Sequence, residues 1–206
     1  MARNLTPVVK LSRREKVALH PKAIKGMVKR PYTPGDHGPT GGRAKLSQYA
    51  VQLREKQKVK RMYGLLEKQF SRVVKEAERR QGVTGDIMLQ LLEQRLDNAI
   101  YRLGVAPSRQ AARQIVTHGH IMLNGRRVDI PSILLHPGDE LVVRPKSAGN
   151  AYFKQLSDEL KGSKGESVRW LSFTPAKLMA KVTGLPARED ISEDINEQLI
   201  IEFYSR

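Results

Sequence analysis

The sequence predicts an α+β fold: a helical N-terminal domain with a basic extended arm, plus a small mixed α/β domain of two helices and a small antiparallel-rich sheet. Apolar residues recur at helical spacing between residues 47 and 116, and they alternate with polar residues after residue 120. Turn sequences separate the alternating stretches. The change of period from helical to alternating is what indicates two kinds of structure in one chain.

Four segments divide the chain on this reading. A basic Pro/Gly-rich arm covers residues 1–46, and a helical domain covers 47–93. The small α/β domain covers 94–146, and residues 147–206 form a C-terminal segment that we expect to pack back on the helical domain.

The arm has little hydrophobic periodicity. It contains five prolines and a glycine cluster at Gly38, Gly41 and Gly42. A segment of this composition cannot build a core of its own, so we expect it to become ordered mainly against a partner.

Four helices are expected before residue 120. The first, Ser47–Arg61, is polar, with Ser47 as its N-cap, and Gly64 interrupts the pattern. Each of the other three has an apolar face and ends at a glycine. In order, these faces and glycines are Leu66, Phe70, Val73, Val74 and Ala77 before Gly82; Leu92, Leu96, Ala99, Ile100 and Leu103 before Gly104; and Ala112, Ile115 and Val116 between the N-cap Ser108 and Gly119.

The strands follow residue 120. Ile121 and Leu123 alternate with polar neighbours, Asn124-Gly125 is a strong hairpin turn, and Val128 and Ile130 alternate again. The remaining elements are a strand at 140–144 after a turn at 136–139, a helix over 150–160, and strands at 170–173 and 199–204.

Positive charge is concentrated in the first third of the chain. The formal net charge is +16, and residues 1–61 hold 16 basic and 3 acidic side chains. Such an excess favours a polyanionic partner, because released counterions drive basic proteins onto phosphate backbones. The alternative is a soluble protein that only carries a basic surface. The sign reverses after Pro186, where acidic side chains suggest contact with a neighbouring protein.

Several classes of protein are excluded by composition. The sequence has no cysteine, which rules out disulfides, thiolate zinc sites and cysteine nucleophiles. No run approaches the ~18 apolar residues of a membrane span. We expect a cytoplasmic protein without a membrane partner.

A basic surface is predicted within residues 94–146. Arg109 and Arg113 are one helical turn apart, and Arg126 and Arg127 follow the hairpin turn. Guanidinium groups form bidentate contacts with phosphate, and the helix N-terminus at Ser108 adds backbone donors. The sequence therefore predicts a surface that recognises structured RNA by its shape. The alternative is a solvated polar face around a core.

The same residues carry a resemblance. Gln94–Gly104 (QRLDNAIYRLG), Ser108–Val116 (SRQAARQIV), His118–Ile121 and Asn124–Val128 resemble the small RNA-binding domain named after ribosomal protein S4. The flanks resemble the S4 family itself, over nearly the whole chain and most specifically from Arg30 onward. The flanking segments are Arg30–Gly38 (RPYTPGDHG), Gln52–Lys60 (QLREKQKVK) and Asn196–Arg206 (NEQLIIEFYSR), with a shorter match at Lys10–Glu15.

The resemblance implies a non-enzymatic, bacterial-type constituent of the small ribosomal subunit. Members bind small-subunit ribosomal RNA early in assembly, at a multi-helix junction of its 5′ domain. They lie where messenger RNA enters, beside the third and fifth small-subunit proteins, and affect decoding accuracy; some repress their own messenger. Messenger contact carries over to Arg43 and Lys45.

Resemblance and charge together define the expected contacts. We expect ribosomal RNA to contact Arg13, Arg14, Lys45, Arg54, Lys56, Lys58, Lys60, Arg61, Arg95, Arg102, Ser108, Arg109, Arg113, His118, His120, Asn124, Arg126 and Arg127. We expect neighbouring proteins to contact Glu189, Asp190, Glu193, Asp194 and Glu197.

The chain departs from the family in its metal chemistry. Many members hold zinc with cysteines of the N-terminal arm, and this sequence has none. His20 and His37 are too few ligands for a tetrahedral site, so we expect no zinc and no other cofactor.

Three other interpretations remain open at this point. Arg95-Leu96-Asp97 is similar to the motif in which pseudouridine synthases place a catalytic Asp, but here it lies in an amphipathic helix and no large catalytic domain accompanies it. His118 and His120 could form a metal pair, but no carboxylate cluster joins them. A generic RNA chaperone would bind RNA without preference.

Overall fold

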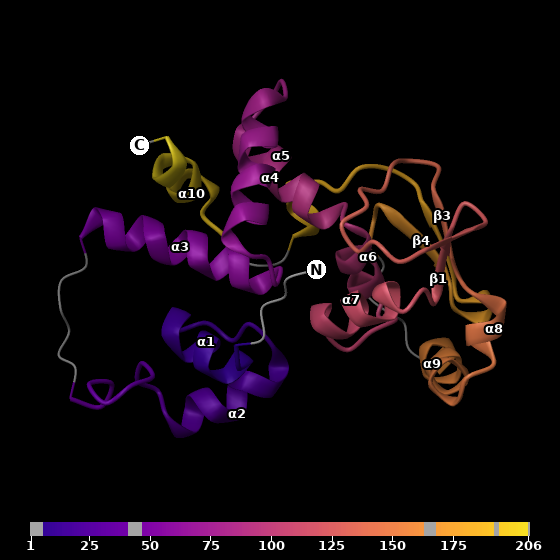
Figure 1. The fold of residues 1–206 in the computed structure, drawn as a ribbon, viewed down its shortest axis with the longest axis horizontal. Coiled ribbons are helices and arrows are strands. Elements are labelled where there is room, and N and C mark those ends of the chain that lie inside the picture. Colours follow the sequence, from indigo (N-terminus) through magenta and orange to yellow (C-terminus); the bar gives the residue numbers. More distant parts are fainter. Residues whose placement is uncertain (1–5, 41–46, 163–167, 192–193, 206) are drawn as a thin grey trace. The chain divides into compact units, whose positions relative to one another are not determined.

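The computed structural model describes residues 6–40, 47–162, 168–191 and 194–205. It divides into two compact units (Figure 1). The helical unit is Met1–Gly85 with Glu193–Arg206, and the sheet unit is Asp86–Ser192. The α+β class expected from the sequence is confirmed.

The helical unit begins with two helices that the sequence analysis did not expect. They are α1 (Val8–Glu15) and α2 (Pro21–Lys29), which pack against each other. His20 caps α2 by accepting a hydrogen bond from the Lys22 amide (3.0 Å), and Pro21 occupies the first helical position. A Cβ at Gly26 would lie 2.6 Å from Val9 Cγ1, so the glycine allows the two helices to approach closely. The expectation of an arm without local structure was therefore wrong for residues 8–29.

The rest of the helical unit is α3 (Gln48–Met62), α4 (Glu67–Arg79) and α10 (Glu197–Tyr204). Ser47 Oγ accepts from the Ala50 amide (3.3 Å), which confirms the predicted N-cap of α3. The last segment, predicted as a strand, is the helix α10. Asn196 caps it by accepting from Leu199 N (3.3 Å), and α10 packs along α3. The run Leu199-Ile200-Ile201 favours a strand by composition, but the N-cap and the packing partner decide for a helix.

The sheet unit follows along α5 (Thr84–Glu93), which crosses from the first unit into the second. The long helix predicted up to Gly104 is in fact two helices, α5 and α6 (Leu96–Arg102). The break occurs at Gln94 and Arg95, where Leu135 N donates to Gln94 O (2.9 Å) and Leu96 N donates to Ile133 O (2.9 Å). The helix α7 (Arg109–Thr117) comes next.

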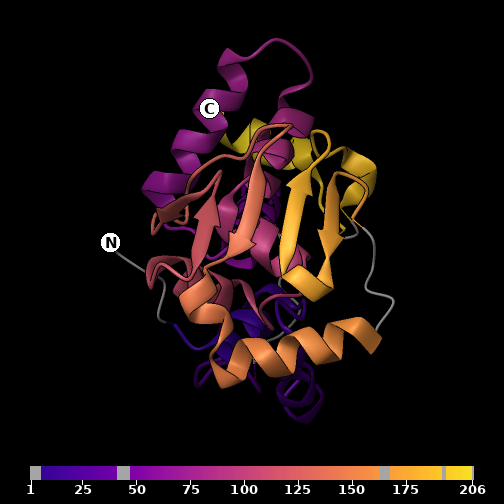
Figure 2. The ribbon, with the colours of Figure 1, turned by 90° about the vertical axis from the view of Figure 1, so that its right-hand side faces the viewer.

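Among the described residues of this unit, five strands form one antiparallel sheet in the order β2-β1-β3-β5-β4 (Figure 2). The strands are β1 (Ile121–Leu123), β2 (Arg126–Val128), β3 (Glu140–Val143), β4 (Leu171–Thr174) and β5 (Met179–Val182). The helices α8 (Pro145–Ala148) and α9 (Ala151–Gly162) connect β3 to β4, and α9 lies at one end of the strands.

The sheet changes the predicted division of the chain. Because β3 pairs with β5, Leu141 facing Ala180, residues 151–182 belong with the α/β domain instead of packing on the helical domain. Among the described residues of the predicted C-terminal segment, α10 packs against α3, and Asp194 and Asn196 just before it also contact α3.

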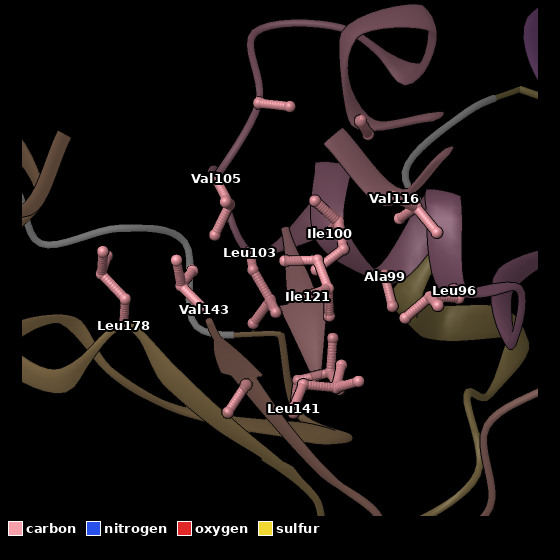
Figure 3. Packing of buried hydrophobic residues seen from close by; sticks show 14 of the residues in the cluster. Leu96, Ala99, Ile100, Leu103, Val105, Val116, Ile121, Leu141, Val143 and Leu178 are labelled. Atoms are coloured by element: carbon pink, nitrogen blue, oxygen red, sulfur yellow. The ribbon is translucent and has the colours of Figure 1, made fainter. Parts of the chain in front are cut away.

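The hydrophobic core of the sheet unit contains residues from before and after residue 146. Leu96 and Ile100 of α6, Val116 of α7, and Ile121 and Leu141 of the sheet are buried together (Figure 3). Trp170, Leu178 and Val182, from beyond residue 146, join the same cluster. The α/β domain therefore includes more of the chain than its motifs indicate.

Candidate nucleic-acid interface

The basic side chains of α3 are held by carboxylates of the protein itself. Lys56 Nζ lies 2.7 Å from Glu67 Oε1, and Lys60 Nζ lies 2.8 Å from Glu67 Oε2. Tyr204 Oη also donates to Glu67 (2.8 Å). Burial opposes ionisation of Glu67, but the hydrogen bonds from Lys56, Lys60 and Tyr204 outweigh it and lower its pKa to about 2. Lys56 is itself buried and lies over the Phe203 ring, 4.3 Å from its centroid.

Arg54 and Arg61 share a second carboxylate, that of Glu15 in α1. Arg61 pairs with Glu15 closely, and Arg54 lies 3.5 Å from the same oxygen. The Glu15 side chain is 1% exposed. Burial raises the pKa of Glu15, and the guanidinium groups of Arg61, Arg54 and Arg14 counteract only part of that effect. These pairs join α1 to α3.

Lys58 holds the segment that leads into α10. Its ammonium group lies 2.7 Å from Glu55 and donates to the Asp194 carbonyl oxygen (2.8 Å). Glu55 in turn accepts from the Asn196 amide (2.9 Å). All five basic residues predicted on α3 thus have partners within the helical unit, and RNA contact by them stays a prediction.

The two predicted arginines of α1 differ in their surroundings. Arg13 donates to the carbonyl oxygens of Arg30 (3.1 Å) and Tyr32 (3.0 Å) and lies over the Tyr32 ring. It therefore holds the segment after α2. Arg14, one position further, is exposed.

In the sheet unit, Asp97 is bound by two of the predicted arginines. Arg95 donates to both of its oxygens (3.0 and 2.8 Å), and Arg113 donates to Oδ2 (3.1 Å). The side chains of Arg95 and Asp97 are each 8% exposed. The negative charge of the buried Asp97 carboxylate is balanced by two guanidinium groups. This geometry gives no support to a catalytic role of Asp97.

Glu93 and Asn98 hold two further arginines. Arg102 donates to both Glu93 oxygens (2.8 and 2.9 Å), and Asn98 Nδ2 donates to Glu93 Oε2 (2.7 Å). Arg109 Nε donates to Asn98 Oδ1 (2.8 Å), and its guanidinium lies 4.6 Å from the Tyr101 ring centroid. This network fixes the direction of Arg109 at the first turn of α7. Ser108 Oγ caps that helix, as predicted, by accepting from the Ala111 amide (3.1 Å).

The β1–β2 hairpin and the end of α7 present exposed basic side chains. Arg126, Arg127 and His118 are exposed. Arg127 lies against the backbone of Gly119, where an added Cβ would overlap its guanidinium group. Asn124 instead serves the turn: it donates to Asp139 (2.8 Å) and accepts from the Glu140 amide (2.9 Å).

His120, which precedes β1, contacts residues of α8 and α9. Its Nδ1 lies 2.9 Å from Ser147 Oγ, and its ring lies 5.7 Å from that of Phe153. Burial and the positive charges of His118, Arg144 and Arg127 lower its pKa. Burial is the largest cause of this lowering, and the neighbouring basic side chains add to it.

The acidic residues predicted to contact proteins are partly engaged within the sheet unit. Glu189 pairs with Arg169 (2.9 Å), with both side chains exposed, and Asp190 accepts from the Ala187 amide (2.9 Å). Asp194 is exposed and Glu197 lies in the first turn of α10. Arg43, Lys45 and Glu193 lie outside the described residues.

A row of basic residues on α4 was not among the predicted contacts. The α4 basic row consists of Lys68, Arg72, Lys75 and Arg79, all exposed. Their spacing along the helix could have been noticed in the sequence, because it repeats every three or four residues.

The described parts of the chain contain neither a metal-ligand cluster nor a membrane-spanning helix. No group of three or more histidine or acidic side chains there could hold a metal ion, so His118 and His120 lack the ligands that a metal site needs. Within the same residues, no helix combines the length and the apolar character of a membrane span.

Comparison with known proteins defines the class first. Residues 3–93 match the family described as the ribosomal protein S4/S9 N-terminal domain, and residues 94–141 match the S4 domain. The chain therefore belongs to the class of proteins in which a helical S4/S9 domain precedes an S4 domain.

Curated relatives narrow this class to one family. The chain is 48% identical over 206 residues to small ribosomal subunit protein uS4 of Roseiflexus castenholzii and 49% identical to that of Chloroflexus aurantiacus. It is 49% identical over 212 residues to uS4 of Thermus thermophilus. Each comparison covers 100% of both chains. The chain belongs to the uS4 family, which consists of structural, non-enzymatic proteins.

Proposed function

We propose that this protein is a structural constituent of the small subunit of the cytoplasmic ribosome and binds small-subunit ribosomal RNA at a junction of the 5′ domain early in assembly. The observation that carries this proposal is the surface formed by α7 and the β1–β2 hairpin. Arg126, Arg127 and His118 are exposed there, and Arg127 lies against the backbone of Gly119.

The α6 network supports the same proposal by ordering neighbouring donors. Asn98 and Tyr101 fix the guanidinium of Arg109 at the first turn of α7. A guanidinium group that is already ordered loses less side-chain entropy when it meets a phosphate. Arrangement of several such groups on one rigid domain suits recognition of a folded RNA by shape.

The finer roles follow from the family resemblance. We propose that Arg43 and Lys45 meet messenger RNA where it enters the subunit. We also propose that the acidic residues Glu189, Asp190, Glu193, Asp194 and Glu197 contact neighbouring small-subunit proteins, the third and the fifth among them, and influence accuracy.

Competition binding tests the proposal. Purified protein is titrated with the 5′ domain of small-subunit ribosomal RNA against an unrelated structured RNA, across a series of salt concentrations. Both affinities should fall steeply with salt, since ~6–10 phosphate contacts lose a factor of ~10³–10⁵ between 50 and 200 mM salt. A preference for the ribosomal fragment that persists at high salt supports site-specific binding. Two curves that fall together, without preference, would favour a generic RNA chaperone.

A further inference from the structure

The α4 basic row lies directly opposite the buried face of its helix. At about 100° per residue, Lys68, Arg72, Lys75 and Arg79 fall within about 60° of one another. Phe70, Val74 and Ala77, on the other side, are each no more than 1% exposed. The row runs along about 16 Å of the helix axis, since each residue adds about 1.5 Å.

The helical unit holds α4 firmly, so the row has a defined direction. Glu67, in the first turn, accepts from Lys56, Lys60 and Tyr204. The Phe70 ring lies 6.2 Å from that of Tyr204. The first turn of α4 is thereby joined to both α3 and α10, and rotation of the helix about its axis would break these contacts.

Within the described residues, the row lacks the carboxylate partners that α3 has. No acidic side chain there pairs with Lys68, Arg72 or Lys75. Arg79 lies 3.5 Å from Glu76, which also pairs with Arg80, and its side chain is 81% exposed. Like charges one turn apart repel one another along a helix, and a bound polyanion would relieve that repulsion.

The residue composition of this face indicates a nucleic acid as the partner, and not a protein. Positions 68, 71, 72, 75, 78 and 79 carry no apolar side chain. Protein interfaces are built around a buried core that is depleted in charged residues and rich in aromatic ones, and this face has no such core. Contacts with nucleic-acid backbones, in contrast, are made largely by arginine and lysine.

We propose that the α4 basic row is a second RNA-binding surface, which follows the phosphate backbone of a double-helical RNA segment. This inference rests on the proposed function, because it assumes that the protein binds RNA. It adds a surface in the helical unit that is separate from the α7 and hairpin residues of the sheet unit.

The first test neutralises the row. In the variant K68Q/R72Q/K75Q, glutamine keeps the helix propensity and removes three charges. The control K154Q/K177Q/K181Q removes three charges from exposed positions of the sheet unit. Binding to the 5′ domain fragment is measured across a salt series, and circular dichroism verifies folding.

We expect the slope of log affinity against log salt to become shallower by about 2–3 for the α4 variant, at about 0.7–0.9 per lost contact. The control should keep a nearly unchanged slope. Equal effects in both variants would show that only net charge matters and would overturn the inference. An unchanged slope in the α4 variant would overturn it as well. Neither result concerns the preference of the unaltered protein for the ribosomal fragment, which tests the proposed function separately.

A second measurement does not depend on the stability of that variant. The sequence contains no cysteine, so Ser71→Cys would supply its single thiol, on the same side of α4 as Lys68 and Lys75. An iron chelate attached there generates hydroxyl radicals that cut nearby RNA. Cuts on both strands of one RNA helix are expected. Absence of cuts in a complex that forms with full affinity would contradict the proposed surface.

Discussion

The helices α3 and α4 are both rich in lysine and arginine, yet they use these residues differently. On α3 the cations meet Glu15, Glu55 and Glu67 within the helical unit. On α4, Lys68, Arg72 and Lys75 lie opposite the buried face and are exposed, and Arg79 is exposed beside Glu76. We therefore expect the number of basic residues to be a poor guide to where a polyanion binds. We expect binding to depend on whether the fold brings a carboxylate to each cation.

The sheet unit repeats this difference. Arg95, Arg102 and Arg113 are bound to Asp97 and Glu93, whereas Arg126 and Arg127 on the hairpin are exposed. In both units we expect paired cations to contribute mainly to stability and exposed cations mainly to binding. The following predictions test that distinction.

The largest effect is expected at Asp97. Asp97→Ala leaves the buried Arg95 guanidinium without its carboxylate, which should lower the free energy of unfolding by roughly 3–5 kcal/mol. Urea unfolding followed by circular dichroism measures this. Asp129→Ala, at an exposed position of the same unit, is the control and should change little. Unchanged stability with lost RNA affinity would mean that the pair serves binding instead.

A smaller loss is expected at Lys56. Lys56→Gln removes a charged hydrogen bond to Glu67 and the contact with the Phe203 ring, worth roughly 2–4 kcal/mol together. The salt dependence of RNA binding should stay unchanged. Lys68→Gln on α4 should show the reverse, with normal stability and a shallower salt dependence. If both variants behave alike, the distinction between α3 and α4 fails.

Alanine substitutions at Gly119 and Gly125 distinguish the effect of backbone strain from the effect of displacing the Arg127 side chain. Both have positive φ, 68° and 78°, so alanine should cost roughly 1–2 kcal/mol of stability at either position. At Gly119 the new Cβ would also overlap Arg127, whereas at Gly125 nothing lies within 4 Å. We expect only Gly119→Ala to weaken RNA binding in a filter assay. Equal affinities for the two variants would exclude a role of Arg127 in binding.

The Glu67 cluster predicts a loss of stability in acid. The folded-state pKa of Glu67 lies below its ordinary value of 4.5, at about 2. Its ionised form therefore stabilises the fold fully above about pH 4.5, and this contribution disappears as the pH falls through about 2. Because its side chain is 48% exposed, the effect should be modest. Urea midpoints of the wild type and Glu67→Gln should converge as the pH approaches 2, and a constant difference would contradict the pairing.

The smallest effect is expected at His120. Its lowered pKa means that stability contributed by the neutral ring is present above pH 6.5, the ordinary value, and is lost as the pH falls through the folded-state pKa. Phosphates bound at Arg127 and His118 would offset the neighbouring positive charges and raise the pKa of His120. Nuclear magnetic resonance titration of the ring, with and without RNA, measures this shift. An identical titration in both states would place the RNA elsewhere.

Local signals in the sequence were sufficient for much of the fold. Ser47 and Ser108 cap the helices that they were expected to begin, and Asn124-Gly125 forms the turn between β1 and β2. Caps and tight turns depend on neighbours within a few residues, so the sequence determines them directly. The run of family motifs from Arg30 to Arg206 likewise led to the family that the comparisons show.

Tertiary structure decided what depends on residues far apart in the chain. Leu199–Tyr204 is a helix because α3 supplies its packing partner, and 151–182 joins the α/β domain because β5 pairs with β3. Likewise, Arg61 meets Glu15 across 46 residues and Tyr204 meets Glu67 across 137. Composition alone counts Arg61 as available to RNA. Only the folded chain shows which charges are already neutralised, because Coulomb energy depends on distance in space and on burial, and not on position in the sequence.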